Sequence, residues 1–332
     1  MTSAMNRQIT LARYPEGLPV EEDFKLLESS LPLAGPGQVL CKTRFLSLDP
    51  YMRSQIAGRH ISGTIAPGDL MRGEAVCEVV ESRDSSISPG STVRCMAGWQ
   101  EYSVHGADKV QIVYPEVQPA SYALSLLGMT GLTAWAGMVW QADVSEGDDV
   151  LIPAVTGGVG SAAAQFCRNR GARVIGIAGS DEKCHSAVDE LGIEACINRK
   201  TEDLAARLDE LFPNGMDVYF DLVGGELLDR ASERLALNAR VILCGLMADY
   251  NNPTRSPGPP PGNWIRSRAT VHGLVVYDFE SRRDEFIAAC LPDLKSGKLK
   301  QREDTSQGIE SAPEAFCRLM RGENFGKVIV AL

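Results

Sequence analysis

The feature that most constrains this chain is an apolar run that enters a glycine-rich turn and leaves it as a helix-like segment. The run is 150–153, the turn carries Gly157, Gly158 and Gly160, and the helical pattern follows. Glycines allow a tight turn and a close approach of the backbone, and amide groups at a helix start attract negative charge. The segment therefore predicts a pyrophosphate site. Because its spacing is Ala-x-x-Gly-x-x-Gly rather than Gly-x-Gly-x-x-Gly, taken alone it also fits an ordinary strand-to-helix turn.

Apolar runs alternate with helical patterns after this turn, which predicts parallel strands with crossover helices. The predicted strands are 149–153, 173–177, 195–197, 217–220 and 240–244, and the predicted helices are 160–170, 182–191, 201–211 and 225–236. A helix-like stretch over 121–140 precedes them, and a strand over 270–277, a helix over 281–296 and a β segment over 326–330 follow. This order is typical of a doubly wound α/β sheet.

The first third of the chain has a different pattern. From Gln38 to Val113, short alternating segments are separated by Pro-Gly pairs at 36–37, 67–68 and 89–90, which predicts a small antiparallel β domain. A length of 332 residues also favours two domains.

Charge and composition exclude several classes of protein. Lys and Arg sum to 33 against 43 Asp and Glu, a net charge of -10 that disfavours nucleic acid and anionic lipid as partners. No apolar run approaches the ~20 residues of a membrane helix, and the first residues lack the apolar core of a signal peptide, so we expect a cytoplasmic protein. The nine cysteines form no Cys-x-x-Cys pair, which indicates reduced thiols rather than a metal or redox site.

The end of the second predicted strand indicates which dinucleotide the chain prefers. A site for NAD presents an acidic side chain there, about 20 residues after the glycines, to bind the ribose 2′-hydroxyl. Here Gly179 and Ser180 leave room for a 2′-phosphate, and Lys183 one turn later can neutralise it, so we expect NADPH. Two alternatives stay open. Asp181 can bind a ribose hydroxyl, although its place at a helix start favours helix capping. Lys183 also fits a solvated position on the surface.

The segment 247–263 is too long for a routine connection. It contains five prolines, at 253, 257, 259, 260 and 261. Because loops of this length are uncommon unless they are functional, we expect the segment to line or cover a binding site as a lid.

Several segments together resemble one known family. They are 46–53 (LSLDPYMR), 127–134 (LGMTGLTA), 178–184 (AGSDEKC), 250–251 (YN) and 324–327 (NFGK). They are similar to the zinc-independent medium-chain dehydrogenase/reductases of the leukotriene B4 12-hydroxydehydrogenase group. That group includes prostaglandin reductases, plant alkenal double-bond reductases and bacterial curcumin reductases. The resemblance runs from end to end, and the Asp-Pro-Tyr-Met-Arg segment is specific to this branch.

The resemblance implies a GroES-like catalytic domain over 1–125, completed by 300–332, and a Rossmann NADPH-binding domain over 126–299. It also implies a homodimer that reduces the C=C bond of α,β-unsaturated ketones or aldehydes, by hydride addition to the β-carbon without a metal. Tyr250 is the implied catalytic residue, whose phenol stabilises the enolate together with a ribose hydroxyl of NADPH. Tyr51 and Tyr277 are implied to line the substrate pocket, although buried aromatic packing explains either position almost as well.

The expected cofactor residues fall into three groups. The pyrophosphate turn is Ala154, Thr156, Gly157, Gly158, Val159 and Gly160, and the 2′-phosphate group is Gly179, Ser180, Lys183 and Arg199. By resemblance, the nicotinamide end rests on Met129, Thr133, Cys244, Gly245, Tyr250, Val275, Val276, Asn324 and Gly326. For Met129 a place in the hydrophobic core is nearly as good an explanation.

The chain lacks the ligands of a zinc alcohol dehydrogenase. Those enzymes carry a histidine in a Gly-His-Glu segment, where this chain has Arg72-Gly73-Glu74, and the four-cysteine zinc lobe is missing as well. None of the histidines has a metal-like spacing to a second ligand; they are His60, His105, His185 and His272. We therefore expect no metal.

Two positions depart from the family pattern. Arg199 stands where many relatives have a tyrosine that contacts the cofactor phosphate, and we expect its charge to replace that contact. Leu222 stands where an asparagine is common, so a polar contact to the cofactor is lost. Two other functions stay open on the residues alone: NADPH-dependent reduction of quinones, and binding of NADPH as a structural or sensing ligand without turnover.

Overall fold

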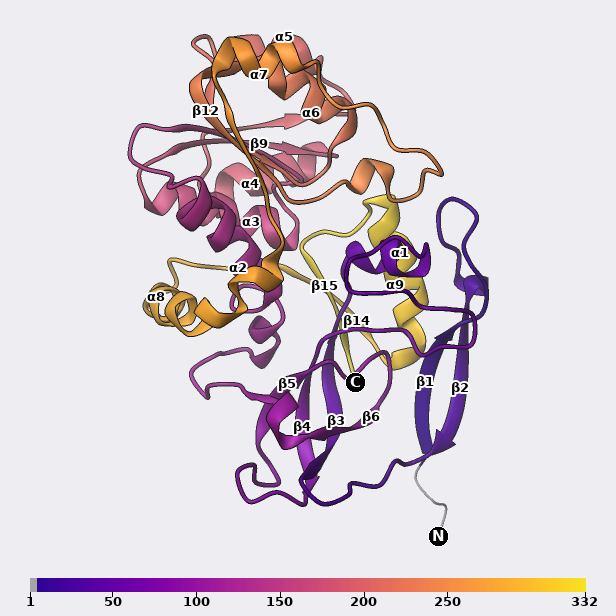
Figure 1. Cartoon of the computed structure of the whole chain (residues 1–332). Helices are drawn as coiled ribbons and strands as arrows, with labels where there is room; N and C mark the ends of the chain where they lie inside the picture. Colours follow the sequence, from indigo (N-terminus) through magenta and orange to yellow (C-terminus); the bar gives the residue numbers. More distant parts are fainter. Residues whose placement is uncertain (1–4) are drawn as a thin grey trace. The chain divides into compact units, whose positions relative to one another are not determined.

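The computed structural model describes residues 5–332 (Figure 1). These residues divide into two compact units, the first made of 5–125 and 302–332 and the second of 126–301. The chain therefore begins the first unit, builds the whole of the second, and returns to complete the first.

The first unit is built on a seven-stranded sheet with the order β14-β15-β3-β4-β5-β7, in which β6 also pairs with β3. The sheet strands are β3 (Gln38–Ser47), β4 (Ala75–Ser82), β5 (Thr92–Cys95), β6 (Tyr102–Gly106), β7 (Gln111–Ile112), β14 (Glu303–Gln307) and β15 (Lys327–Ala331). Strands β3 to β7 pair antiparallel, which confirms the predicted β domain over 38–113. The final strand was also predicted, and it lies between β14 and β3.

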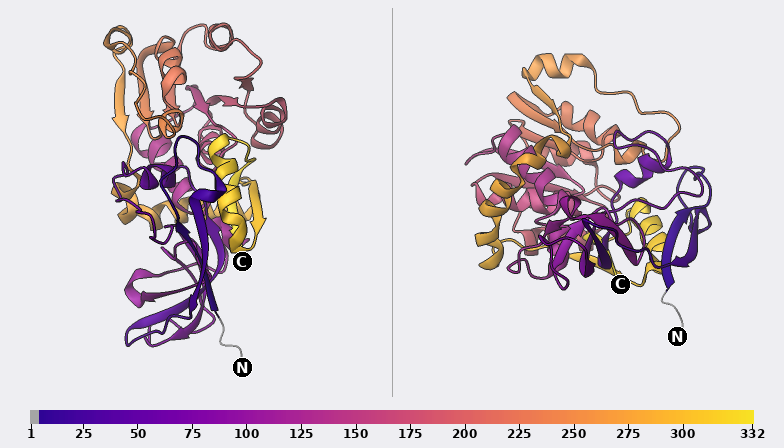
Figure 2. Two further views of the ribbon diagram at one scale, coloured as in Figure 1. Left: turned by 90° about the vertical axis from the view of Figure 1, so that its right-hand side faces the viewer. Right: turned by 60° about the horizontal axis from the view of Figure 1, so that its bottom comes forward.

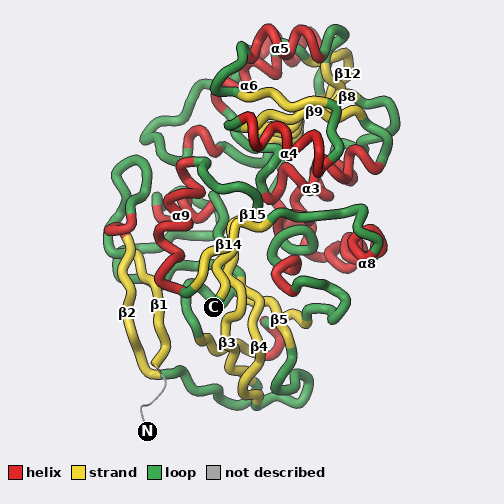
Figure 3. The backbone as a smooth tube through the Cα atoms, turned by 180° about the vertical axis from the view of Figure 1, so that it is seen from behind, coloured by secondary structure: helices red, strands yellow, loops and turns green. Residues whose placement is uncertain are grey.

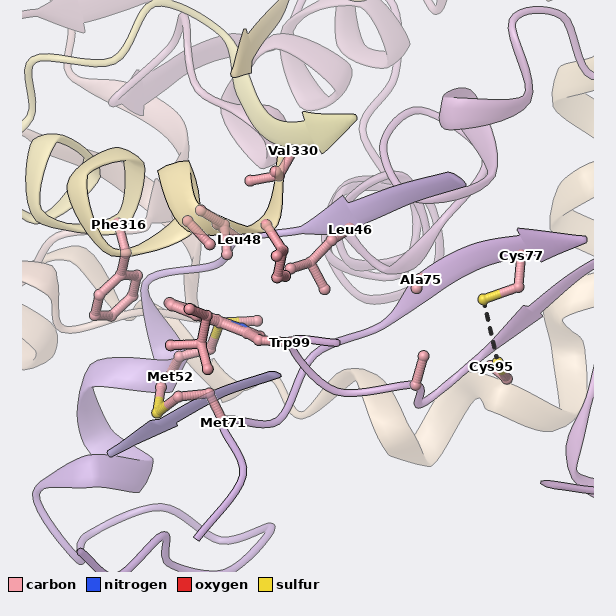
Figure 4. Packing of buried hydrophobic residues seen from close by; sticks show 14 of the residues in the cluster. Leu46, Leu48, Met52, Met71, Ala75, Cys77, Cys95, Trp99, Phe316 and Val330 are labelled. Atoms are coloured by element: carbon pink, nitrogen blue, oxygen red, sulfur yellow. Dashed lines mark hydrogen bonds between the residues drawn. The ribbon is translucent and has the colours of Figure 1, made fainter. Parts of the chain in front are cut away.

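A hairpin and two helices complete this unit. They are β1 (Met5–Leu11) with β2 (Phe24–Ser30), α1 (Tyr51–Ile56) and α9 (Ala312–Arg321). Figure 2 shows α9 beside strand β15, which it contacts. The core centres on Trp99, which is fully buried, with ring centroids 5.6 Å from both Phe24 and Phe316 (Figure 4). Burying three such rings supplies much of the hydrophobic free energy of this unit.

A buried ion pair joins the two ends of the chain within the first unit. Lys327 Nζ lies 3.1 Å from Asp49 Oδ1, and the two side chains are 3% and 5% exposed. The ammonium also donates to the carbonyls of Leu48 at 2.7 Å and Val328 at 3.0 Å, and Ser47 Oγ donates to the Asp49 carboxylate. A buried pair is tolerated only when its remaining donors and acceptors are satisfied in this way.

The second unit is a six-stranded parallel sheet with the order β10-β9-β8-β11-β12-β13. The strands are β8 (Asp149–Pro153), β9 (Arg173–Ala178), β10 (Ala195–Asn198), β11 (Met216–Asp221), β12 (Leu235–Leu243) and β13 (Thr270–Gly273). The helices are α2 (Met129–Trp135), α3 (Gly158–Asn169), α4 (Asp181–Leu191), α5 (Leu204–Leu211), α6 (Gly225–Ser232), α7 (Pro261–Ser267) and α8 (Arg283–Lys295). Figure 3 shows α3 and α4 over the strands of this sheet. The predicted doubly wound sheet is confirmed.

Three predicted elements were wrong in extent, each because tertiary contacts override the local pattern. The predicted helix 121–140 is a 3₁₀ turn (Ala120–Ala123), then α2, then a π-helical segment (Ala136–Gln141). The predicted helix 225–236 ends at Ser232, because Leu235 already pairs with Met216 as the start of β12. The predicted strand 270–277 ends at Gly273, where its partner strand β12 ends, and Val276–Arg282 forms a 3₁₀ segment.

Within residues 5–332 we find no helix that combines the length and the hydropathy needed to cross a bilayer.

Replacing Lys327 with methionine should lower the free energy of unfolding by about 3–5 kcal/mol, because it leaves the buried Asp49 carboxylate without its counter-charge. Urea denaturation followed by circular dichroism measures the change. The control is Lys298→Met, whose ion pair with Asp293 is 3.5 Å long and largely exposed, and which should cost less than about 1 kcal/mol. Equal losses in the two variants would contradict the account of Lys327.

Candidate functional site

The turn between β8 and α3 leaves a helix start open to a ligand. Gly157 precedes α3, and no side chain caps the helix. A Cβ on Gly160 would lie 2.3 Å from the carbonyl oxygen of Ala154, so only glycine lets α3 begin this close to the strand. The first amide groups of a helix lack partners within it. The turn, which also carries Thr156, Gly158 and Val159, can therefore hold an anion by backbone N–H groups.

The end of β9 lies next to two cationic side chains. Ser180 caps α4, its Oγ accepting from the backbone N–H of Lys183 at 3.3 Å. A Cβ built on Gly179 would lie 3.8 Å from Lys200 Cε and 4.0 Å from both Nε and Nη2 of Arg199. The structure thus brings Arg199 and Lys200 to Gly179, and the backbone of Lys183 to Ser180. Sequence reasoning missed Lys200, although its place next to Arg199 could have indicated it.

The expected role of Asp181 as the helix cap is wrong. Ser180 is the cap, and Asp181 is the first residue of α4. Its Oδ1 instead accepts a hydrogen bond from Asn198 Nδ2 at 2.7 Å. An Asp at the first helical turn still favours the helix through the macrodipole.

A buried aspartate holds together the ends of β11 and β12. The Oδ1 atom of Asp221 accepts from the Tyr219 hydroxyl at 3.0 Å and from the N–H groups of Val223 at 3.1 Å and Gly224 at 2.8 Å. Its carbonyl accepts from the N–H groups of Cys244 at 2.9 Å and Gly245 at 3.1 Å. Burial raises the pKa of the Asp221 carboxyl, and these hydrogen bonds oppose the rise.

Leu222, one of the two positions that depart from the family pattern, directly follows Asp221 and packs inward. The Leu222 side chain is buried, and a Cβ on Gly245 would lie 2.7 Å from the Leu222 carbonyl oxygen. Glycine at 245 is therefore required for the two strand ends to approach. Sequence reasoning missed Asp221, although an Asp three positions before a Gly-Gly pair is typical of a side-chain-stabilised turn.

Asp249 closes the first part of the proline-rich segment on itself, and Ala248 attaches it to the loop after β11. Asp249 ends a 3₁₀ turn (Met247–Asp249), and its carboxylate accepts from Ser256 Oγ at 2.7 Å and Ser256 N–H at 3.1 Å. The N–H of Ala248 donates to the Val223 carbonyl at 3.0 Å. Burial by itself would raise the pKa of Asp249, but the hydrogen bonds from Ser256 and the nearby charge of Arg255 hold it below its usual value.

Tyr250 directly follows this pinned turn and is half-buried. Burial raises the pKa of its phenol above the usual value of 10.0. A hydrogen bond with the backbone of Leu246 lowers the pKa, but the effect of burial is larger. The hydroxyl therefore keeps its proton at neutral pH and can act as a hydrogen-bond donor. Cys244 and Gly245 lie at the end of the preceding strand, on the same carboxyl edge of the sheet as Gly157 and Gly179.

The other predicted residues of the second unit lie on three elements. Met129 and Thr133 are on α2, where the Thr133 hydroxyl donates to the Met129 carbonyl at 2.8 Å. Val275 and Val276 begin the 3₁₀ segment after β13 rather than lying on a strand. Tyr277 on that segment is 43% exposed, so burial in a core does not explain it.

Tyr51, Asn324 and Gly326 belong to the first unit. Tyr51 is the first residue of α1, with its ring centroid 5.0 Å from that of His60. Asn324 Nδ2 donates to the Gly326 carbonyl at 2.8 Å. Gly326 has a φ of +106°, and a Cβ there would lie 2.3 Å from the Arg302 carbonyl, so the position requires glycine.

No group of three or more His, Cys, Asp or Glu side chains in residues 5–332 is arranged to hold a metal ion. The nine cysteines are all free thiols.

Comparison with known proteins relates both units to oxidoreductases. Residues 7–113 match a family model described as the N-terminal domain of oxidoreductase, and residues 158–291 match one described as zinc-binding dehydrogenase. The chain is 35% identical to the NADPH-dependent curcumin reductase of Escherichia coli K12, over 98% of this chain and 96% of that protein. It is 36% identical to prostaglandin reductase 1 of Bos taurus, over 97% of each chain.

Two further similarities span nearly the whole chain. The NADP(+)-dependent 2-alkenal reductase of Nicotiana tabacum is 34% identical over 98% of this chain and 97% of its own. The crystal structure of CurA from Vibrio vulnificus in complex with NADPH matches with a TM-score of 0.93 and 37% identity, over 98% of both chains.

Changing Asp249 to asparagine should expose the proline-rich segment to protease. The aspartate uses one oxygen for the Ser256 N–H and the other for the Ser256 hydroxyl. Asparagine has a single oxygen and no charge, so one charge-assisted hydrogen bond is lost and the segment opens more often. We expect tryptic cleavage after Arg255 to accelerate about tenfold, the effect of losing one hydrogen bond to a charged group. Mass spectrometry of timed digests measures it.

The matched control is Asp278→Asn, the same chemical change on an exposed carboxylate outside the segment. It should leave cleavage after Arg255 unchanged. If Asp249→Asn is cleaved at the wild-type rate, Asp249 does not restrain the segment.

Proposed function

The chain belongs to the medium-chain dehydrogenase/reductase family, in the group that contains the curcumin, prostaglandin and 2-alkenal reductases, and from this premise we propose that it reduces the C=C bond of α,β-unsaturated ketones or aldehydes with NADPH. The observation that carries the proposal is the similarity along the whole chain to reductases whose names specify NADPH or NADP(+). A 2-alkenal is by definition an α,β-unsaturated aldehyde, which gives the substrate class.

The residues at the carboxyl edge of the second unit fit NADPH. The pyrophosphate would lie against the N–H groups of 157–160, because no side chain caps this helix start. Gly160 lets the helix begin close to Ala154 at the end of the strand. The 2′-phosphate would lie at Gly179 and Ser180, where Lys183 and Arg199 supply positive charge. This preference follows from the positive charge of Arg199 and Lys200 beside Gly179, and the Asp181 carboxylate is hydrogen-bonded to Asn198.

The nicotinamide end and the substrate are assigned to the remaining predicted residues. We assign the nicotinamide to Met129, Thr133, Cys244, Gly245, Val275, Val276, Asn324 and Gly326, and the substrate pocket to Tyr51 and Tyr277. The first unit, 1–125 with the C-terminal segment, is then the catalytic domain, and the second the NADPH-binding domain.

When bound, NADPH supplies a hydride for the β-carbon of the substrate. Negative charge then develops on the carbonyl oxygen, and in a site without a metal it must be met by hydrogen-bond donors. Tyr250 is our catalytic residue, because burial keeps its phenol protonated and therefore able to donate to this oxygen. The turn pinned by Asp249 fixes the backbone from which the phenol projects.

The function is tested by following NADPH oxidation with an enone, a 2-alkenal, a quinone and a saturated ketone. We expect turnover with the enone and the alkenal, and none with the saturated ketone. Turnover with the quinone alone would replace our proposal with a quinone reductase, and tight NADPH binding with no turnover on the panel would indicate a non-catalytic NADPH-binding protein.

Replacing Tyr250 with phenylalanine should lower kcat for the enone about 10²-fold, because one hydrogen-bond donor to the developing oxyanion is lost. The Kd of NADPH should not change, because the hydroxyl acts in the transition state. Stopped-flow measurement of hydride transfer and calorimetry with NADPH separate the two effects. In the wild type, a kcat that depends on this phenol should be constant at neutral pH and fall only in alkaline solution, as the pH rises through the phenol's pKa, which burial holds above its usual value.

Tyr114→Phe is the control, since Tyr114 is 45% exposed and has no assigned role. It should leave hydride transfer at the wild-type rate. An unchanged hydride-transfer rate in Tyr250→Phe would remove Tyr250 from the mechanism.

We also propose that the protein acts as a cytoplasmic homodimer. The family resemblance supports the dimer, and the nine free cysteines suit a reducing compartment. Light scattering coupled to size-exclusion chromatography tests the oligomeric state.

A further inference from the structure

Asn198 is a buried polar residue at the carboxyl end of β10 with every side-chain group engaged. It is 3% exposed. Its Nδ2 donates to Asp181 Oδ1 at 2.7 Å, and its Oδ1 accepts from the backbone N–H of Lys200 at 3.0 Å. A backbone N–H can only donate, so the amide oxygen must face Lys200 and the amide nitrogen must face the carboxylate. The orientation of the side chain is therefore determined by its two partners.

One consequence concerns the charge next to the 2′-phosphate site. Asp181 follows Ser180, at the end of the second strand, where a free carboxylate would bind a ribose 2′-hydroxyl and repel a 2′-phosphate. Asn198 occupies this carboxylate with a hydrogen bond and holds it toward β10. An acidic side chain at an NAD-selecting position is thus held away from that role.

The other consequence concerns the positive charges. The N–H of Arg199 donates to the Ala178 carbonyl at 3.1 Å, and the Asn198 oxygen holds the N–H of Lys200. The backbone N–H of Asn198 in turn donates to Glu202 Oε1 at 2.7 Å, which closes the turn. The side chains of Arg199 and Lys200 consequently lie within about 4 Å of a Cβ built on Gly179.

We propose that Asn198 is the positioning residue that sets cofactor preference. Its amide nitrogen holds Asp181 away from the ribose, and its amide oxygen holds the backbone of Lys200, next to Arg199, beside Gly179. The inference rests on the proposed use of NADPH and names the residue that selects it. Asn198 itself does not touch the cofactor.

The test is a double-mutant cycle between Asn198 and Asp181. In Asn198→Ala the ratio of kcat/KM for NADPH to that for NADH should fall about tenfold, which corresponds to about 1.4 kcal/mol. The change should lie in KM for NADPH, with kcat at saturating NADPH retained. Adding Asp181→Asn should restore most of the ratio, whereas Asp181→Asn in the wild-type background should change it less than about twofold. Arg199→Ala should raise KM for NADPH more than KM for NADH.

A binding measurement tests the same inference without turnover. Calorimetry with 2′,5′-ADP and with 5′-AMP reports the contribution of the 2′-phosphate alone. Asn198→Ala should weaken 2′,5′-ADP about tenfold and leave 5′-AMP unchanged, and Asp181→Asn should reverse the loss. If Asn198→Ala does not fold, Asn198→Asp replaces it. This variant keeps an oxygen that accepts from the Lys200 N–H, but its carboxylate repels that of Asp181. Adding Asp181→Asn restores a hydrogen bond between the two side chains, now with the amide at 181 donating to the carboxylate at 198.

The outcomes separate the inference from the proposed function. Equal losses for 2′,5′-ADP and 5′-AMP, or a loss that Asp181→Asn does not reverse, would reduce Asn198 to a structural residue and overturn the inference while leaving NADPH use intact. If the wild-type protein binds 2′,5′-ADP no more tightly than 5′-AMP, the proposed preference for NADPH fails, and the inference fails with it.

Discussion

The buried ion pair between Lys327 and Asp49 is the interaction on which the first unit depends. It joins residues almost three hundred positions apart, and each charge needs the other because neither is hydrated. The carbonyls of Leu48 and Val328 accept the remaining protons of the ammonium, so the pair forms in one register of β15 against β3 only. In this register the N–H of Leu48 donates to the Val328 carbonyl at 3.2 Å, so the end of β3 meets the start of β15. A hydrophobic pair would tolerate a shifted strand, and a buried ion pair would not.

The second unit follows a similar rule at the carboxyl edge of its sheet. Loops there carry little hydrophobic surface, and short polar side chains hold them instead: Asp221 fixes the turn after β11, Asp249 fixes the turn before Tyr250, and Asn198 fixes the turn after β10. Each satisfies backbone N–H groups that would otherwise require water. The starts of α3 and α6, which both follow glycines at this edge, have no side-chain cap.

The sequence predicted the architecture better than it predicted the side-chain contacts. The strands predicted at 149–153 and 173–177 were found from local patterns, because a buried parallel strand is a continuous apolar run. The extent of β12 and β13 was not, because it is decided by the length of the neighbouring strand. Asp181 was taken for a cap because its partner Asn198 is seventeen positions away on another element. The roles of Lys200, Asp221 and Asp249 likewise depend on contacts between elements, which no local pattern in the sequence reports.

The return of the chain to its first unit has a consequence for synthesis on the ribosome. Strand β15 lies between β14 and β3, and it is the last strand to be translated. While residues 126–301 emerge, the nascent first unit exposes the edge of β3 that β15 will later cover, a surface prone to pairing with other chains. The second unit is continuous in sequence and can fold as soon as it is released, whereas the first must wait until β15 has emerged. That edge of β3 therefore stays unpaired for as long as residues 126–301 take to be translated.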